Sequence, residues 1–504
     1  MRPKGKTDVF SKAIALIFFA AAFAPAKAQQ QKGVNIIYIL ADDHRYDAMG
    51  FMNKIQGLQT PGMDRMAREG AHLQQAFVTT ALCSPSRASI LTGQYAHTHT
   101  VVDNDAPLPS NLKFFPQYLQ QKGYQTAFFG KWHMGNTGDQ PQPGFTHWES
   151  FEGQGTYYDV TLNINGKRQK QEGYTTDLLT EHAVQWLNNR NKSKPFFVYL
   201  SHKGVHAEFQ PAKRHEGKYA DLPIVTPPSM YLTATDSSKH YGNATAPATK
   251  VNYADIPKWV REQRYSWHGV DYMYHGAIPF DVFYRRYLET LLAVDESVQT
   301  MLDWVIKEGL QQNTMVVYMG DNGFSFGEHG LIDKRHAYEE SMRVPLLAWA
   351  PGIIKAGIQL PQVVMNIDIA PTFLDFAGIQ KPAHMQGQSL APLLRGQNVT
   401  GWRDTMFYEY YWEAPFPQTP TTFAVRTNRY KYIFYNGVWD TNELYDLKAD
   451  PYEMNNLIRD SSMRQTGLAL KAALFSWLQR TGGQQIPLKR PPNTRFDNRY
   501  NQTY

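Results

Sequence analysis

The stretch VNIIYILADDH at residues 34–44 gives the strongest indication of the fold. Residues 34–40 are almost continuously apolar and rich in β-branched side chains, which predicts a strand buried on both faces of a parallel sheet. Similar runs lie at residues 124–129, 195–201, 314–319 and 344–350. Helical patterns lie between them at residues 61–69, 112–122, 175–188 and 283–307. This alternation predicts an α/β fold with a large, mostly parallel sheet sandwiched by helices.

The chain changes character after residue 390, where shorter aromatic strands are expected at 407–412, 422–426 and 430–435, with a helix near 468–478. This pattern predicts a smaller C-terminal α+β domain with an antiparallel sheet. We therefore predict a signal peptide at 1–28, a catalytic α/β domain at 29–390, an α+β subdomain at 391–483 and an irregular tail at 484–504.

The first 28 residues have the features of a secretory signal. Basic residues precede an apolar run at 13–23, and Ala26-Lys27-Ala28 offers a cleavage site. The run is too short to cross a bilayer, so we expect an exported protein with no transmembrane segment. The bacterial periplasm is the first expectation, with secretion or the cell surface as alternatives. The segment carries five basic residues and one acid, so its removal lowers the formal net charge from +6 to +2. That small charge argues against a nucleic-acid partner.

Two pairs of hard oxygen ligands follow predicted strands. Asp42 and Asp43 come directly after residues 34–40, and Asp321 and Asn322 follow residues 314–319. Open α/β sheets place ligands at the carboxyl ends of their strands. Since these side chains offer carboxylate and amide oxygens without histidine or thiolate, they favour Ca²⁺ over a transition metal. The alternative reading is a pair of ordinary turns or helix caps.

Cys83 is the only cysteine in the chain and begins the stretch CSPSRASILTG at residues 83–93. Pro85 suits a first helical turn and Gly93 a helix end, so Cys83 is expected at a helix N-terminus. Arg87, four residues on, returns to the same face, and together these features favour an anion at Cys83. The alternative is a small buried apolar side chain.

Candidate cations and acids also lie at strand ends. Lys131 and His133 follow residues 124–129, and their alternation predicts that both side chains lie on one side of an extended chain. His202 and His206 follow residues 195–201, and either is a candidate acid. The His97-Thr98-His99 step is interpreted as a hydrogen-bonding loop rather than a metal site.

Cys-x-Pro-x-Arg ending in Leu-Thr-Gly resembles the signature of the type I sulfatases, formylglycine-dependent enzymes of the alkaline phosphatase-like superfamily. The Gly-Lys-Trp-His stretch at 130–133 and residues 327–345 are similar to further segments of that family. The resemblance implies that a maturation enzyme oxidises Cys83 to formylglycine (3-oxoalanine), whose hydrated aldehyde is the nucleophile. It implies one Ca²⁺ per chain, with these metal ligands: Asp42, Asp43, Cys83, Asp321 and Asn322. It also implies these catalytic residues: Cys83, Arg87, Lys131, His133, His206 and Lys334.

The expected partner is a sulfated oligosaccharide. TLNINGK at 161–167 and GYTTD at 173–177 are similar to N-acetylglucosamine-6-sulfatases, which points to exo-acting removal of a hexosamine 6-sulfate. Alternatives are an algal polysaccharide sulfatase acting on ulvan or carrageenan, a phosphate or phosphonate ester hydrolase, and a non-catalytic glycan binder with unconverted Cys83. Residues 207–280 are expected to wall the cleft, with Glu409 and Arg426 as specificity residues.

Overall fold

Strand β1 (Asn35–Ala41) lies inside a ten-stranded sheet and is buried along its whole length. The computed structural model describes residues 1, 33–135, 138–233, 253–272, 278–437 and 440–487. In it β1 pairs in parallel with β7 (Phe196–Ser201) on one side and β8 (Thr314–Gly320) on the other. The apolar run is thus covered by backbone partners on both edges, as expected for a central parallel strand.

The sheet runs in the order β10-β2-β9-β8-β1-β7-β3-β4-β5-β6. The remaining strands are β2 (Ala71–Phe77), β3 (Gln125–Lys131), β4 (His147–Phe151), β5 (Thr161–Ile164), β6 (Lys167–Lys170), β9 (Leu346–Trp349) and β10 (Ile358–Met365). Strand β9 runs antiparallel between β2 and β8, and β5 and β6 form an antiparallel hairpin at one edge. The predicted large, mostly parallel sheet is confirmed.

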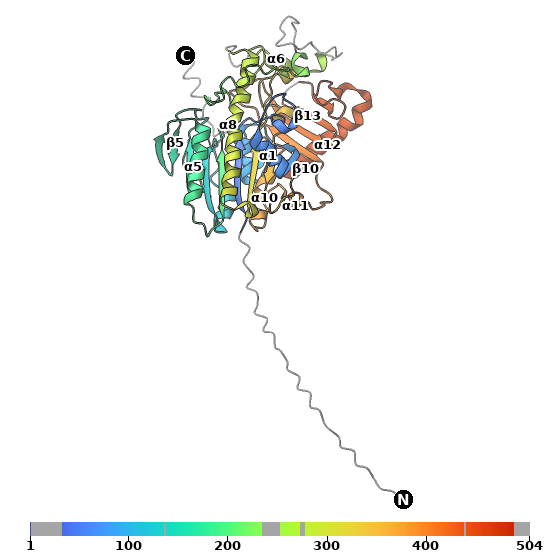
Figure 1. The fold of residues 1–504 in the computed structure, drawn as a ribbon. Helices are drawn as coiled ribbons and strands as arrows, with labels where there is room; N and C mark the ends of the chain where they lie inside the picture. Colours follow the sequence, from blue (N-terminus) through green and yellow to red (C-terminus); the bar gives the residue numbers. More distant parts are fainter. Residues whose placement is uncertain (2–32, 136–137, 234–252, 273–277, 438–439, 488–504) are drawn as a thin grey trace. The chain divides into compact units, whose positions relative to one another are not determined.

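Helices cover both faces of this sheet. On β1, Ile36, Tyr38 and Leu40 join one apolar core, while Ile37 and Ile39 join the other. The first core packs against α2 (Cys83–Thr92), α4 (Phe115–Gln121) and α10 (Ile369–Phe376). The second packs against α1 (Pro61–Glu69), α5 (Thr175–Asn189) and α8 (Phe280–Lys307), and α5 and α8 lie side by side (Figure 1).

A second, four-stranded antiparallel sheet follows, in the order β11-β12-β13-β14, as the sequence predicted. Its elements are β11 (Thr405–Tyr410), β12 (Thr421–Thr427), β13 (Tyr430–Asn436), β14 (Glu443–Asp446) and the long helix α12 (Arg464–Thr481). Its attachment to the segment after β8 is partly ionic, because buried Lys431 pairs with Glu339 at 3.0 Å, and partly apolar, because Tyr338 shares one core with Tyr445. The smaller sheet therefore holds part of the loop that carries Lys334.

Short helices complete the described chain. They are α3 (Ala96–His99), α6 (Lys258–Gln263), α9 (Glu339–Met342) and α11 (Ala391–Leu394), with 3-10 turns at Gly50–Met52, Pro228–Tyr231, Tyr253–Asp255, Gln311–Asn313, Glu328–Gly330, Asn366–Asp368, Leu457–Arg459 and Ser461–Met463. Helix α4 is shorter than the predicted 112–122 because Pro116 fixes its first turn.

The predicted signal peptide and most of the predicted tail lie outside the described residues, as do 234–252 and 273–277 of the predicted cleft wall. Among the described residues, no helix combines the length and the apolar character that crossing a membrane requires.

Candidate functional site

The carboxylates of Asp42, Asp43 and Asp321 converge at the carboxyl ends of β1 and β8, with one oxygen from each within 4.8 Å of the others. The register explains this, because Ala41 lies opposite Gly320 and the chains leave the sheet together. The backbone N–H of Asp43 donates to Asp321 Oδ1 at 3.1 Å. The predicted meeting of these two strand ends is therefore present.

These acids are buried and mutually repulsive. Burial raises the pKa of Asp43 to about 7; the ammonium of Lys334 opposes this shift, whereas Asp42 and Asp321 add to it. For Asp42 burial works in the same upward direction, but Lys131, together with other nearby cations, holds the pKa of its carboxyl well below the usual range. Three buried carboxylates this close are stabilised by a shared positive charge.

Asn322 completes an oxygen-lined site. Its Nδ2 donates to Asp43 Oδ1 at 2.7 Å, and its buried Oδ1 has no hydrogen-bond partner among the described residues. A buried carbonyl oxygen without a partner is costly unless something ligates it. Three carboxylates and one amide oxygen are the donors that a hard divalent cation prefers, so the residues present fit such an ion.

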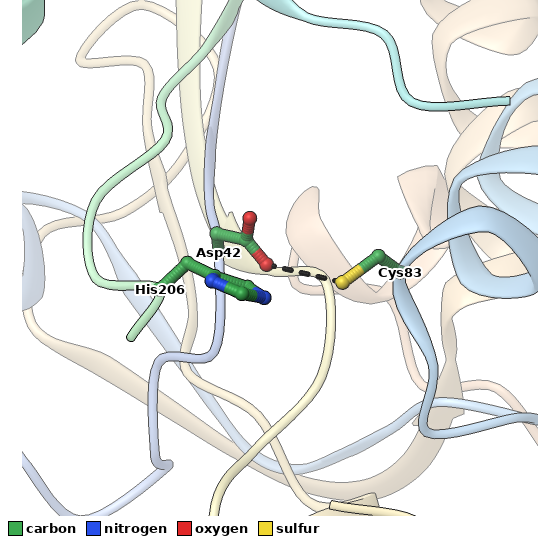
Figure 2. Close-up of side chains that lie close together, drawn as sticks. All are labelled: Asp42, Cys83 and His206. Atoms are coloured by element: carbon green, nitrogen blue, oxygen red, sulfur yellow. Dashed lines mark hydrogen bonds between the residues drawn. The ribbon is translucent and has the colours of Figure 1, made fainter. Parts of the chain in front are cut away.

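Cys83 is the first residue of α2, and its buried side chain faces the acids. Its Sγ lies 3.3 Å from Asp42 Oδ1, 3.1 Å from Lys334 Nζ and 3.6 Å from Lys131 Nζ. Figure 2 shows the sulfur directed at the Asp42 carboxylate, with the His206 ring beside both. Burial, reinforced by Asp42, raises the pKa of the thiol to about 12, whereas the ammonium groups of Lys131 and Lys334 act to lower it.

Arg87 is buried and donates hydrogen bonds to residues at three strand ends. Its Nε donates to Asp321 Oδ2 at 2.9 Å, and one terminal nitrogen donates to the carbonyl of Lys131 at 2.6 Å and to Ser201 Oγ at 2.7 Å. The side chain thus links β8, β3 and β7 beneath the site. It orients the acid cluster and the backbone that carries Lys131.

Lys131 forms an ion pair with Asp42, and Gln154 connects it to His133. Gln154 Oε1 accepts from Lys131 Nζ at 2.5 Å, and its Nε2 lies 3.2 Å from His133 Nε2. His133 has φ of 50°, so the predicted extended alternation is wrong, although both side chains reach one site. The sequence did not single out Gln154, because no pattern distinguishes it within the loop after β4.

The two candidate acids after β7 lie in different surroundings. His206 lines the cavity described below, with Nε2 3.9 Å from Asp43 Oδ2, and burial holds the pKa of its imidazole well below the usual range. His202 instead turns to helix α8, where its Nε2 lies 2.9 Å from Ser297 Oγ. The geometry favours His206 as the group that meets a substrate.

Lys334 connects the acid cluster to a cavity of about 760 Å³. It forms an ion pair with Asp43, and it lines the cavity floor together with Asp43, His133 and His206. The cavity walls include residues 152–154, 266–268, 413 and 415–418. Of the described part of the long segment that was expected to form the wall, residues 266–268 line the cavity.

Glu409 and Arg426 do not line this cavity, so their predicted role in specificity is wrong. Glu409 Oε2 lies 2.8 Å from His97 Nδ1, and Arg426 Nε lies 3.1 Å from Glu339 Oε1; all four side chains are buried. His99, in the same short helix as His97, lies 3.0 Å from Ser89 Oγ. The predicted hydrogen bonding of His97 and His99 is present, but both residues lie in helix α3 and not in the expected loop.

A mostly parallel sheet with acids and lysines near its strand ends, beside a cysteine that begins a helix, is consistent with the alkaline phosphatase-like fold. Comparison with known proteins narrows the class. Residues 34–379 match the sulfatase family model, and residues 327–480 match the C-terminal region of N-sulphoglucosamine sulphohydrolase. The chain belongs to the sulfatase family and is a sulfuric ester hydrolase.

Three relatives illustrate the similarity. An N-acetylglucosamine-6-O-sulfatase of Bacteroides thetaiotaomicron is 36% identical over 488 residues, covering 88% of this chain and 86% of its own. An ulvan-active sulfatase of Formosa agariphila is 28% identical, covering 89% and 82%. A structure solved in complex with its substrate, D-glucosamine-2-N,6-O-disulfate, has a TM-score of 0.77 and 33% identity, covering 90% and 99%. Family membership generally implies a formylglycine and a divalent metal.

Proposed function

We propose that this sulfatase removes the 6-O-sulfate from a hexosamine at the end of a sulfated oligosaccharide. The observation that carries the chemistry is the placement of Cys83 Sγ within contact distance of Asp42, Lys131 and Lys334. The choice of sugar is supported by the names of the relatives, since the 36% identical protein is an N-acetylglucosamine-6-O-sulfatase and the 33% identical structure holds a 6-O-sulfated glucosamine.

Maturation and metal loading are part of the proposal. Cys83 is converted to formylglycine by a maturation enzyme, and Ca²⁺ is held by Asp42, Asp43, Asp321 and Asn322, whose oxygens suit it. The converted side chain completes the ligand set. The exported location, with the periplasm first, is also a proposal that rests on the leader at residues 1–28.

Once converted and loaded, the site supplies an attacking hydroxyl on the side chain of residue 83 beside a divalent cation, which lowers the pKa of that hydroxyl. Lys131 and Lys334 flank Cys83 Sγ, so their ammonium groups are placed to hold the oxygens of a sulfate. Such preorganised cations stabilise charge that builds up in the transition state, and loss of one donor typically costs about 10²–10³ in rate.

We assign the two proton transfers of the reaction to His206 and His133. His206 lies at the cavity floor, where it is placed to protonate the departing sugar oxygen, a role worth about 10²–10⁴ in rate. His133 Nε2 is held by Gln154 and is placed to take a proton from the side chain of residue 83 as sulfate is released. Arg87 keeps Asp321 and the Lys131 carbonyl in position and does not contact the substrate.

Two measurements test this function. Mass spectrometry of the Cys83 peptide, from protein made with the native maturation machinery, should show an aldehyde in place of an alkylatable thiol. Activity should then be measured on N-acetylglucosamine 6-sulfate, the 3-sulfate isomer, an ulvan oligosaccharide and a phosphate monoester, with Cys83→Ala as the inactive control. Preference for the 3-sulfate, ulvan or phosphate would reject the hexosamine 6-sulfate assignment, and a retained thiol in active protein would reject the nucleophile.

A further inference from the structure

One wall of the cavity comes from the smaller sheet, through the loop that joins β11 to β12. Half-buried Phe416 of this loop lines the cavity. Its ring lies 3.5 Å from Arg335 Cζ and 4.8 Å from the His268 ring centroid. Trp267 lines the same cavity and is 49% exposed. Large aromatic surface at a cavity is available for contact with an apolar face of a ligand.

Glu413 of the same loop is only 1% exposed and also lines the cavity. Its Oε1 accepts from Arg335 Nε at 2.9 Å and from the hydroxyl of Tyr410 at 2.9 Å. Among the described residues, its Oε2 accepts no hydrogen bond. A buried carboxylate held by one oxygen leaves the other as a strong acceptor with a fixed direction.

Arg335 connects this wall to the catalytic floor. It follows Lys334, whose ammonium lies 3.1 Å from Cys83 Sγ, and its guanidinium contacts both Phe416 and Glu413. Asp333 also holds Arg335, at 2.9 Å. The Arg335 guanidinium is therefore already paired with Asp333 and Glu413 and stacked on the Phe416 ring. A ligand whose sulfate lies at Lys334 occupies a cavity that Glu413 and Phe416 also line.

We propose that the β11–β12 loop and Trp267 form the subsite for the sugar ring that bears the sulfate. Phe416 and Trp267 pack against the C–H face of the ring, and Glu413 Oε2 accepts a hydrogen bond from a ring hydroxyl. A sugar ring has such an apolar face and a hydroxyl rim, which matches the aromatic and carboxylate surfaces of this wall. This inference rests on the proposed function and names the residues that recognise its substrate.

Glu413→Gln tests the hydrogen bond with little change of shape. The glutamine oxygen still accepts from Arg335 and Tyr410, whereas its NH₂ replaces Oε2, the acceptor that we propose for the ring hydroxyl. We expect kcat/KM for N-acetylglucosamine 6-sulfate to fall about tenfold or more, because a lost charged hydrogen bond leaves the hydroxyl unpaired. An aryl sulfate has no ring hydroxyl, so its kcat/KM should stay within about twofold. Glu216→Gln, at an exposed carboxylate that does not line the cavity, is the matched control and should leave both substrates unchanged.

Phe416→Leu tests the packing through binding rather than turnover. It is introduced into Cys83→Ala protein, and calorimetry measures the Kd of N-acetylglucosamine 6-sulfate. We expect the Kd to rise about tenfold, which is within the range for losing one ring-stacking contact. If Cys83→Ala protein with intact walls binds no sulfated sugar while the unmutated enzyme cleaves aryl sulfate, the hexosamine substrate and the subsite both fail. If the sugar binds equally well to the wall variants, or if Glu413→Gln reduces aryl sulfate turnover as much as sugar turnover, only the subsite fails.

Discussion

Replacing Arg87 by methionine should destabilise the protein strongly, even without substrate or cation. Met keeps most of the side-chain length and removes the charge. Arg87 is 1% exposed and lies 2.8 Å from Asp321 through one terminal nitrogen and 2.9 Å through Nε. Its loss leaves Asp321 as a buried carboxylate without its nearest cation, and leaves the Lys131 carbonyl and Ser201 Oγ without a donor.

The expected size follows from the burial. Removing one partner of a buried ion pair costs about 3–5 kcal/mol of unfolding free energy. Unfolding entropy is about 2.1 cal/mol/K per residue, so a chain of 504 residues has about 1 kcal/mol/K at its midpoint. We therefore expect the Tm of Arg87→Met to fall by about 3–5 °C.

Arg214→Met is the matched control. The Arg214 side chain is 45% exposed and lies 2.7 Å from Asp177 and 2.5 Å from Glu296. Exposed ion pairs contribute about 0–1 kcal/mol, so this variant should lose no more than about 1 °C.

Differential scanning calorimetry in a chelating buffer compares the two variants with the wild type. Equal Tm losses for Arg87→Met and Arg214→Met would refute the argument that Arg87 neutralises a buried acid. Saturating Ca²⁺ should narrow the gap between Arg87→Met and the wild type, because the ion gives Asp321 another positive partner. A gap that Ca²⁺ leaves unchanged would contradict the proposed role of Asp321 as a ligand.

Three further outcomes are expected. Gln154→Leu should lower kcat for an aryl sulfate about tenfold with little change in Tm, since Lys131 and His133 lose their shared partner. Burial lowers the pKa of His202 to about 3, against about 6.5 when unfolded, so its stabilising contribution is complete above pH about 6.5 and falls as the pH drops towards 3. His202→Gln should therefore lose less Tm between pH 7 and pH 5 than the wild type in calorimetric scans. Ca²⁺ at about 100 times its Kd should raise the wild-type Tm by about 3 °C, and Asn322→Ala should show a smaller rise at the same concentration.

Much of the cavity floor was predictable because Asp43 and His133 follow apolar strands closely. A strand buried in a parallel sheet can be recognised in the sequence as a continuous apolar run. Its carboxyl end lies at the same edge of the sheet as the carboxyl ends of its parallel neighbours. Asp42 and Asp321 therefore meet as expected, and Cys83 begins α2 where Pro85 and Gly93 set its limits. The local conformation of His133 was not predictable, because nothing in its sequence neighbourhood indicates a positive φ.

The walls were harder to predict because they depend on how the smaller sheet docks. Strands β11 and β12 were expected, but the face that each presents to the larger sheet is fixed only by contacts distant in sequence. The side chains of Glu409 and Arg426 pair with the buried residues His97 and Glu339. Glu413, three residues beyond β11, lines the cavity instead. Strand β2 was also missed, because AHLQQAF at 71–77 lacks a continuous apolar run.

The surroundings of Cys83 were easier to predict than the cavity walls because different kinds of structure form them. Apart from Lys334, which a loop carries, the groups around Cys83 lie close to strand ends, whose positions are fixed by backbone pairing across the large sheet. The cavity walls come from loops that include 152–154, 266–268, 413 and 415–418, which backbone pairing does not constrain. Loops can change length and composition at little cost to the core. Relatives named for a glucosamine 6-sulfate and for ulvan can therefore share one fold and reaction while differing in the sugar they admit.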